Sequence, residues 1–266
     1  AVGAFALDAN TTASKSTAIG YAALSANTTG AENTAIGYQC LDNNTTGVEN
    51  TAVGSDALTS NTTGNNNVAV GRQAMLANTT GHYNTAVGWR SIKTANNNYN
   101  VAVGSQAAEL TTGQLNTAIG YYAGRNATSG ENYTFVGAYC GGAATMTGHH
   151  NTGIEYHCIH RVTSGYDNTC LGDMSGEYIT TGFRNTTVGR LAGGDIATGS
   201  YNIMLGYNAE PSGTAVGQCV LGDSNIATLR CNTQSISSLS DRRDKTDIVD
   251  LPVGLDFINT LQPRTF

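Results

Sequence analysis

Apolar and polar residues follow one short pattern that repeats along most of the chain. A typical unit is Asn33-Thr34-Ala35-Ile36-Gly37, in which a polar pair, two apolar residues and a glycine follow one another. The glycine that ends this pattern is called the marker glycine here, and it recurs every 16 to 18 residues as Gly3, Gly20, Gly37, Gly54, Gly71, Gly88, Gly104, Gly120, Gly137, Gly172, Gly189 and Gly206, with Glu155 once in its place. A fixed period of this kind indicates a repeat architecture.

Each unit is too short and too closely bounded by glycine for a helix of ten residues or more. A second glycine falls seven residues before the marker in most units, as at Gly47, which follows an Asn-Thr-Thr corner. We therefore predict two short strands per unit, one ending at Ile36 and one near Cys40 and Leu41. The predicted fold is all-β: a repetitive parallel β-solenoid with rungs of about 17 residues, stacked at about 4.8 Å.

Three positions of the unit have a constant character and predict the interior. The residue before the marker is aliphatic, as at Ile19 and Ile36, and we expect it to form the buried column. The residue three after the marker is small, usually Ala and in other rungs Cys40, Cys140 or Cys158, and we expect these cysteines to be buried free thiols. The residue four before the marker is nearly always Asn, which predicts side-chain hydrogen bonds from rung to rung.

Composition excludes several classes of function. Charged residues are 12% of the chain and the net charge is −6, so no basic surface for nucleic acid is expected. No apolar run reaches the roughly 20 residues of a membrane span, so no membrane insertion is expected. No Cys-x-x-Cys pair or catalytic triad pattern is present. An enzymatic cleft formed between subunits stays open as an alternative.

Two groups of side chains are candidates for binding. Four histidines lie near Glu155: His149, His150, His157 and His160. Their spacing matches no metal motif, so we expect corner histidines and neither a metal nor a cofactor. The residue after the marker is often aromatic, and these rings either stack between rungs or bind glycans. The candidate aromatic residues are Tyr21, Tyr38, Trp89, Tyr121, Tyr156 and Tyr207.

The repeat of residues 1–222, with its Asn-Thr-Ala-Ile-Gly-Tyr-x-Ala pattern, resembles the head repeat of trimeric autotransporter adhesins and the shafts of phage tail fibres. Both are trimeric β-rolls, so the resemblance implies a homotrimeric fibre. A single narrow coil also has little core of its own, which favours packing against other chains.

After Gly222 the period ends, and residues 240–266 carry a second pattern. It consists of Ser240-Asp241-Arg242-Arg243-Asp244-Lys245, then Ile248, then Gly254-Leu255-Asp256-Phe257-Ile258-Asn259 and Leu261-Gln262-Pro263. This resembles the start of the endosialidase-type intramolecular chaperone domain of phage tailspikes, here truncated. The resemblance implies trimerisation, assisted folding and self-cleavage at Leu239-Ser240, with Ser240 as nucleophile and Lys245 as its base. Residues 223–239 would form a β-rich linker.

Together these features favour the structural shaft of a viral tail fibre or spike involved in host attachment. Its expected partners are two further copies of itself, other tail or virion proteins, and a glycan or receptor on the host surface. Its expected location is the virion, after assembly in the host cytoplasm. The alternative is a bacterial trimeric surface adhesin that binds host glycans or matrix. No substrate-directed activity is expected, and at most self-cleavage by the complete chaperone domain.

Overall fold

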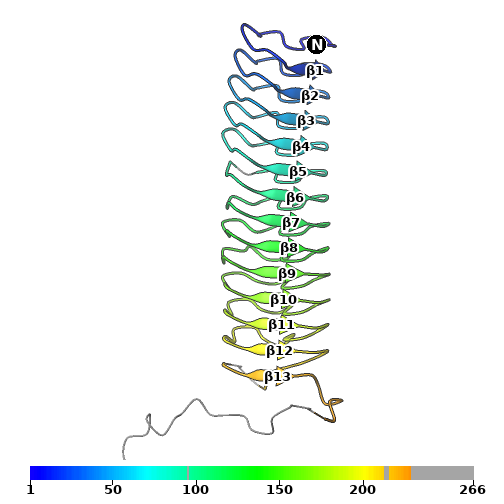
Figure 1. Cartoon of the computed structure of the whole chain (residues 1–266), viewed down its shortest axis with the longest axis vertical. Coiled ribbons are helices and arrows are strands. Elements are labelled where there is room, and N and C mark those ends of the chain that lie inside the picture. The colour runs from blue at the N-terminus through cyan, green and yellow to red at the C-terminus, as the bar shows by residue number, and fades with distance from the viewer. Residues whose placement is uncertain (95, 213–215, 229–266) are drawn as a thin grey trace, which may run out of the picture. The chain divides into compact units, whose positions relative to one another are not determined.

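The structure is a computed structural model that describes residues 1–94, 96–212 and 216–228. The chain divides into two units, Ala1–Ile226 and Ala227–Phe266, and the first contains a single stack of coils (Figure 1). Each coil contributes one strand to a parallel sheet whose 13 strands follow one another in chain order. The strands are β1 (Thr17–Ile19), β2 (Thr34–Ile36), β3 (Thr51–Val53), β4 (Val68–Val70), β5 (Thr85–Val87), β6 (Val101–Val103), β7 (Thr117–Ile119), β8 (Thr134–Val136), β9 (Thr152–Ile154), β10 (Thr169–Leu171), β11 (Thr186–Val188), β12 (Ile203–Leu205) and β13 (Cys219–Leu221). The predicted parallel β-solenoid is confirmed.

The strands pair in register, so that equivalent residues of successive units lie side by side. Thr34 pairs with Thr51 and Ile36 with Val53, and the same alignment continues along the sheet. The second strand that we predicted near Cys40 and Leu41 is wrong. Gln39 and Leu41 have φ angles of 48° and 55°, which curl the backbone into turns. The backbone N–H of Leu41 nevertheless donates to the carbonyl of Ala57 at 3.0 Å, so the turns also stack from rung to rung.

The predicted buried column is also wrong, because the aliphatic residues before the marker face outward. Ile19 is 42% exposed and Ile36 is 37% exposed, whereas Ala18 and Ala35 are fully buried. Successive side chains of a strand point to opposite faces, so only the middle residue of each three-residue strand enters the interior. The interior beside the sheet is narrow, and alanine occupies this position in most rungs.

The remaining core comes from the turn that follows each strand. The small residues three after the marker are buried as predicted, including Cys40, Cys140 and Cys158, which are free thiols. The next residue of each turn supplies the larger apolar side chains of the first rungs. These fully buried residues are Leu24, Leu41, Leu58, Met75 and Ile92.

Two columns of buried asparagines join the rungs. The predicted column before the strands is confirmed: Asn50 Nδ2 donates to Asn33 Oδ1 at 3.1 Å and to the carbonyl of Gly64 at 2.8 Å. The Asn of the Asn-Thr-Thr-Gly corner forms a second ladder, in which Asn44 Nδ2 donates to Asn27 Oδ1 at 2.9 Å. Both ladders supply partners for polar groups that the tight corners remove from water.

The coil around β8 has a different core. Phe135 replaces the strand alanine and stacks on Tyr133, which replaces the ladder asparagine; their ring centroids are 4.6 Å apart. The Phe135 ring fits because Gly141 stands where other rungs carry a leucine or isoleucine. A Cβ on Gly141 would lie 2.7 Å from Cζ of Phe135. Large and small residues have exchanged places within one rung, which keeps the volume of the core.

We predict that Gly71→Ala destabilises the solenoid by about 2–4 kcal/mol. Gly71 has a φ of 129°, and an added Cβ would lie 2.6 Å from the carbonyl oxygen of Gly88 on the next rung. Gly217 is the matched control, since it also has a positive φ, of 70°, but an added Cβ there meets no atom within 4 Å. Chemical denaturation of both variants measures the effect, and equal losses would contradict a steric origin.

Candidate functional site

The six aromatic residues singled out from the sequence are all exposed, by between 42% and 55%. They do not form one stripe. Tyr21 and Tyr38 stack on each other with centroids 5.4 Å apart, while Trp89 and Tyr207 each lie beside an arginine. Tyr121 and Tyr156 are two rungs apart and are linked through Tyr139, which sequence reasoning did not select.

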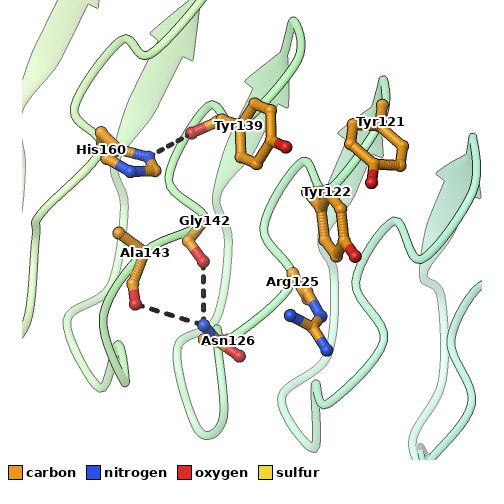
Figure 2. Close-up of a pocket in the computed structure, with 8 residues that line it drawn as sticks. All are labelled: Tyr121, Tyr122, Arg125, Asn126, Tyr139, Gly142, Ala143 and His160. Carbon is orange, nitrogen blue, oxygen red and sulfur yellow. Dashed lines mark hydrogen bonds between the residues drawn. The ribbon is translucent and has the colours of Figure 1, made fainter.

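Tyr121 lines a pocket, here called the tyrosine pocket (Figure 2). The pocket has a volume of about 380 Å³ and lies at the turns that follow β7, β8 and β9. Its lining residues are Tyr121, Tyr122, Arg125, Asn126, Tyr139, Gly142, Ala143 and His160. Its volume falls within the range of small-molecule sites.

The hollow exists because one rung supplies almost no side chain at this place. Gly142 and Ala143 occupy the positions filled by Arg125 and Asn126 on the preceding rung, and His160 aligns with Gly142 on the following one. Asn126 Nδ2 donates to the carbonyl oxygens of Gly142 and Ala143, at 2.9 and 3.3 Å, and so holds the floor in place (Figure 2).

Three tyrosine rings form one wall of the pocket. The rings of Tyr122 and Tyr139 stack with centroids 5.3 Å apart, and Tyr121 lies edge-on to both. A hydrogen bond with Tyr122 is the main reason why the pKa of Tyr121 is raised, to about 12. The Tyr121 hydroxyl is therefore protonated at neutral pH and can serve as a donor.

Arg125 supplies the positive charge of the pocket. Its Nε donates to Glu109 Oε2 at 2.8 Å, and its guanidinium lies 4.6 Å from the centroid of the Tyr122 ring. Glu109 also accepts from Gln106 at 2.6 Å and pairs with Arg90 at 3.3 Å, while its side chain is only 3% exposed. Burial alone would raise the pKa of Glu109, but these three partners outweigh it and the pKa is lowered.

The four histidines do not gather at one place. His157 and His160 stack with centroids 4.2 Å apart beside the tyrosine pocket, whereas His150 pairs with Asp167 on another corner. Burial lowers the pKa of His160, whose Nδ1 is 2.7 Å from the carbonyl oxygen of Tyr139. In the described part of the chain, no three His, Cys, Asp or Glu side chains are grouped so that they could hold a metal ion.

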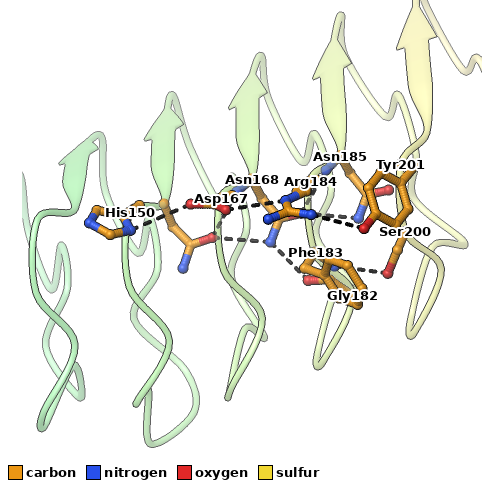
Figure 3. Close-up of polar contacts among 10 residues, drawn as sticks. His150, Asp167, Asn168, Gly182, Phe183, Arg184, Asn185, Ser200 and Tyr201 are labelled. Carbon is orange, nitrogen blue, oxygen red and sulfur yellow. Dashed lines mark hydrogen bonds and ion pairs between the residues drawn. The ribbon is translucent and has the colours of Figure 1, made fainter.

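The corner before the strands carries a row of polar contacts that the sequence did not suggest (Figure 3). His150, Asp167, Arg184 and Tyr201 lie on successive rungs, and Arg184 contacts Asp167 at 3.5 Å and Tyr201 at 2.9 Å. Beneath them the ladder continues, with Asn185 Nδ2 donating to Asn168 Oδ1 at 3.0 Å. Because these pairs are exposed to solvent, each contributes little to the stability of the fold.

A regular feature of the surface is the outer face of the sheet. It is formed by the first and third residues of β1 to β13 and is called the outer strand face here. The third residue is aliphatic in every strand, and none of these residues is buried. The first residue is also aliphatic in some strands, such as Val101 and Ile203. A band of apolar side chains thus follows the whole stack of strands.

Ser240 and Lys245, the predicted self-cleavage residues, lie outside the described residues, as does the bond between Leu239 and Ser240. Over the described ranges, no helix is long and apolar enough to cross a membrane. Comparisons with models of protein families, with curated proteins and with solved structures found no match. The site is therefore interpreted from its own geometry.

The charge cluster around Glu109 makes stability depend on pH. Since the folded-state pKa of Glu109 lies below the ordinary 4.5, its contribution is present above pH 4.5 and is lost as the pH falls through the folded value. We predict that Glu109→Gln lowers the free energy of unfolding by about 1–3 kcal/mol at pH 7, and that this loss is smaller below about pH 4. Denaturation at several pH values measures it, with the exposed Glu49→Gln as control; a cost that does not change with pH would contradict the assignment.

Proposed function

We propose that this protein is the structural shaft of a homotrimeric viral tail fibre or spike that serves host attachment. The observation that carries the proposal is the outer strand face. Val103, Ile119 and Leu205 are 37% to 39% exposed in the single chain, and they belong to a band that recurs with every rung. Contiguous exposed apolar surface of this kind marks interaction sites.

The spacing of the band favours further copies of the same chain as the partner. A partner that covers it must present apolar groups with the same repeat along its length. Another copy of this solenoid has that repeat, because its strands stack in the same register. The number three rests on the resemblance of the repeat to trimeric β-rolls. Packing three such faces together would supply the wide core that each narrow coil lacks.

Replacing outward aliphatic residues with lysine tests this assembly. We predict that the double variant Val103→Lys, Ile119→Lys shifts the protein from trimer to monomer, with an affinity loss of about tenfold or more, because charges would be buried together at the interface. Light scattering coupled to size exclusion gives the molar mass.

The matched control is Thr46→Lys, Thr63→Lys, which places the same charges on exposed corner positions of two rungs. It should remain trimeric. A wild-type chain that is monomeric, or an outer-face variant that stays trimeric, would contradict the proposal.

The C-terminal pattern supports a viral fibre over the alternative of a bacterial surface adhesin, because it resembles a tailspike chaperone. We predict that expression of the full-length gene yields a shaft that ends at Leu239, and that Ser240→Ala leaves the chain uncut. Intact-mass spectrometry distinguishes the two products. Thr233→Ala, on the other side of the bond, serves as control and should be cut normally; an uncut wild-type product would contradict self-cleavage and favour the adhesin.

A further inference from the structure

Beyond its role as a shaft, we propose that the tyrosine pocket binds a saccharide that carries a carboxylate group. The inference adds a ligand site to the proposed attachment function, and it rests on features of the pocket that the shaft function does not use. These are an aromatic wall, a cation with free donors, and the hollow beside Gly142 and Ala143.

The aromatic wall suits the apolar face of a sugar ring. Tyr122 and Tyr139 are half-buried, and with Tyr121 they place three rings around one hollow (Figure 2). The C–H faces of sugars pack on aromatic faces, while tyrosine hydroxyls hydrogen-bond with the sugar hydroxyls. Asn126 adds a polar side chain at the edge of the same hollow.

Arg125 selects the charge of the ligand. Its Nε is bound to Glu109, but within the described residues its two terminal nitrogens have no protein acceptor. Glu109 faces both Arg90 and Arg125, so one negative charge is set against two positive ones and this cluster keeps a net charge of +1. A guanidinium with free terminal N–H groups binds a carboxylate through two parallel hydrogen bonds.

His160 contributes a hydrogen-bonding group and not a second charge. Its pKa is lowered, mainly by burial, so the imidazole is neutral at pH 7. Its Nδ1 is held at the Tyr139 carbonyl, and its other ring nitrogen can pair with a sugar hydroxyl. The pocket therefore combines one cation with several neutral donors and acceptors, which fits a singly charged sugar.

A comparison within the chain shows that the hollow does not follow from glycine alone. Gly194 occupies the same position of its rung as Gly142, but there the carboxylate of Glu210 fills the space and accepts from the N–H of Gly194 at 2.8 Å. At Gly142 the equivalent residue of the following rung is Ile159, which is buried, and the N–H of Gly142 donates to the carbonyl oxygen of Tyr139 at 3.3 Å. None of the residues that line this hollow is acidic.

The experiment measures binding of the trimeric shaft to oligosaccharides that contain glucuronic acid or sialic acid, and to matched neutral oligosaccharides. We expect the acidic sugars to bind about tenfold or more tightly than the neutral ones. Ala143→Trp should abolish binding by filling the hollow, and Ala77→Trp should not. Ala77 is the control because it is exposed at the same position of another rung.

A second pair of variants tests the charge. Arg125→Gln should remove the preference for acidic sugars, whereas Lys93→Gln, at the same position two rungs earlier, should leave it intact. Thermal melts and light scattering of each variant report folding and assembly separately, so a loss of binding in a folded trimer concerns the pocket alone. Absence of binding to any of the sugars, equal binding of acidic and neutral sugars, or normal binding by Ala143→Trp would overturn the proposal.

Discussion

The structure depends on how closely the backbone of one rung lies against the backbone of the next. At the marker glycines this distance leaves no room for a side chain, since a Cβ on Gly71 would lie 2.6 Å from the carbonyl of Gly88. The same closeness lets equivalent residues pair along 13 strands and lets asparagines pass hydrogen bonds from rung to rung. Rungs that stack this tightly with one three-residue strand each enclose only a narrow interior.

The narrow interior also determines which side chains of the strands face outward. Alanine enters the core from most strands, and the larger aliphatic residues on either side of it face outward. From its strands the chain therefore buries small residues and exposes larger aliphatic ones, while the turns bury larger side chains such as Leu24 and Leu58. The assembly that we propose, through the outer strand face, would remove these outward-facing aliphatic residues from water. The tyrosine pocket lies at the turns after the strands, beyond that face.

The sequence predicted the period, the parallel solenoid, the asparagine ladder and the burial of Cys40, because each depends only on the spacing of residue types. It misplaced the aliphatic column, since a three-residue strand shows which residues share a face but not which face is inside. It also predicted a strand at Cys40 and Leu41, which is wrong. The φ of 55° at Leu41 is unusual for a leucine, so the residue type does not indicate the turn. The pocket was missed because it depends on three consecutive rungs. Aligning Arg125, Gly142 and His160 in one column would have revealed the gap.

The most direct test of the account is the solvent accessibility of the outer strand face in the assembled protein. Hydroxyl-radical footprinting with mass spectrometry measures this residue by residue. If copies cover the face, Ile119 and Leu205 should be oxidised as slowly as the core residue Leu58, while Tyr178, which is 42% exposed and lies away from the sheet, reacts rapidly. Rapid oxidation of Ile119 and Leu205, at the level expected from their exposure in the single chain, would contradict the account.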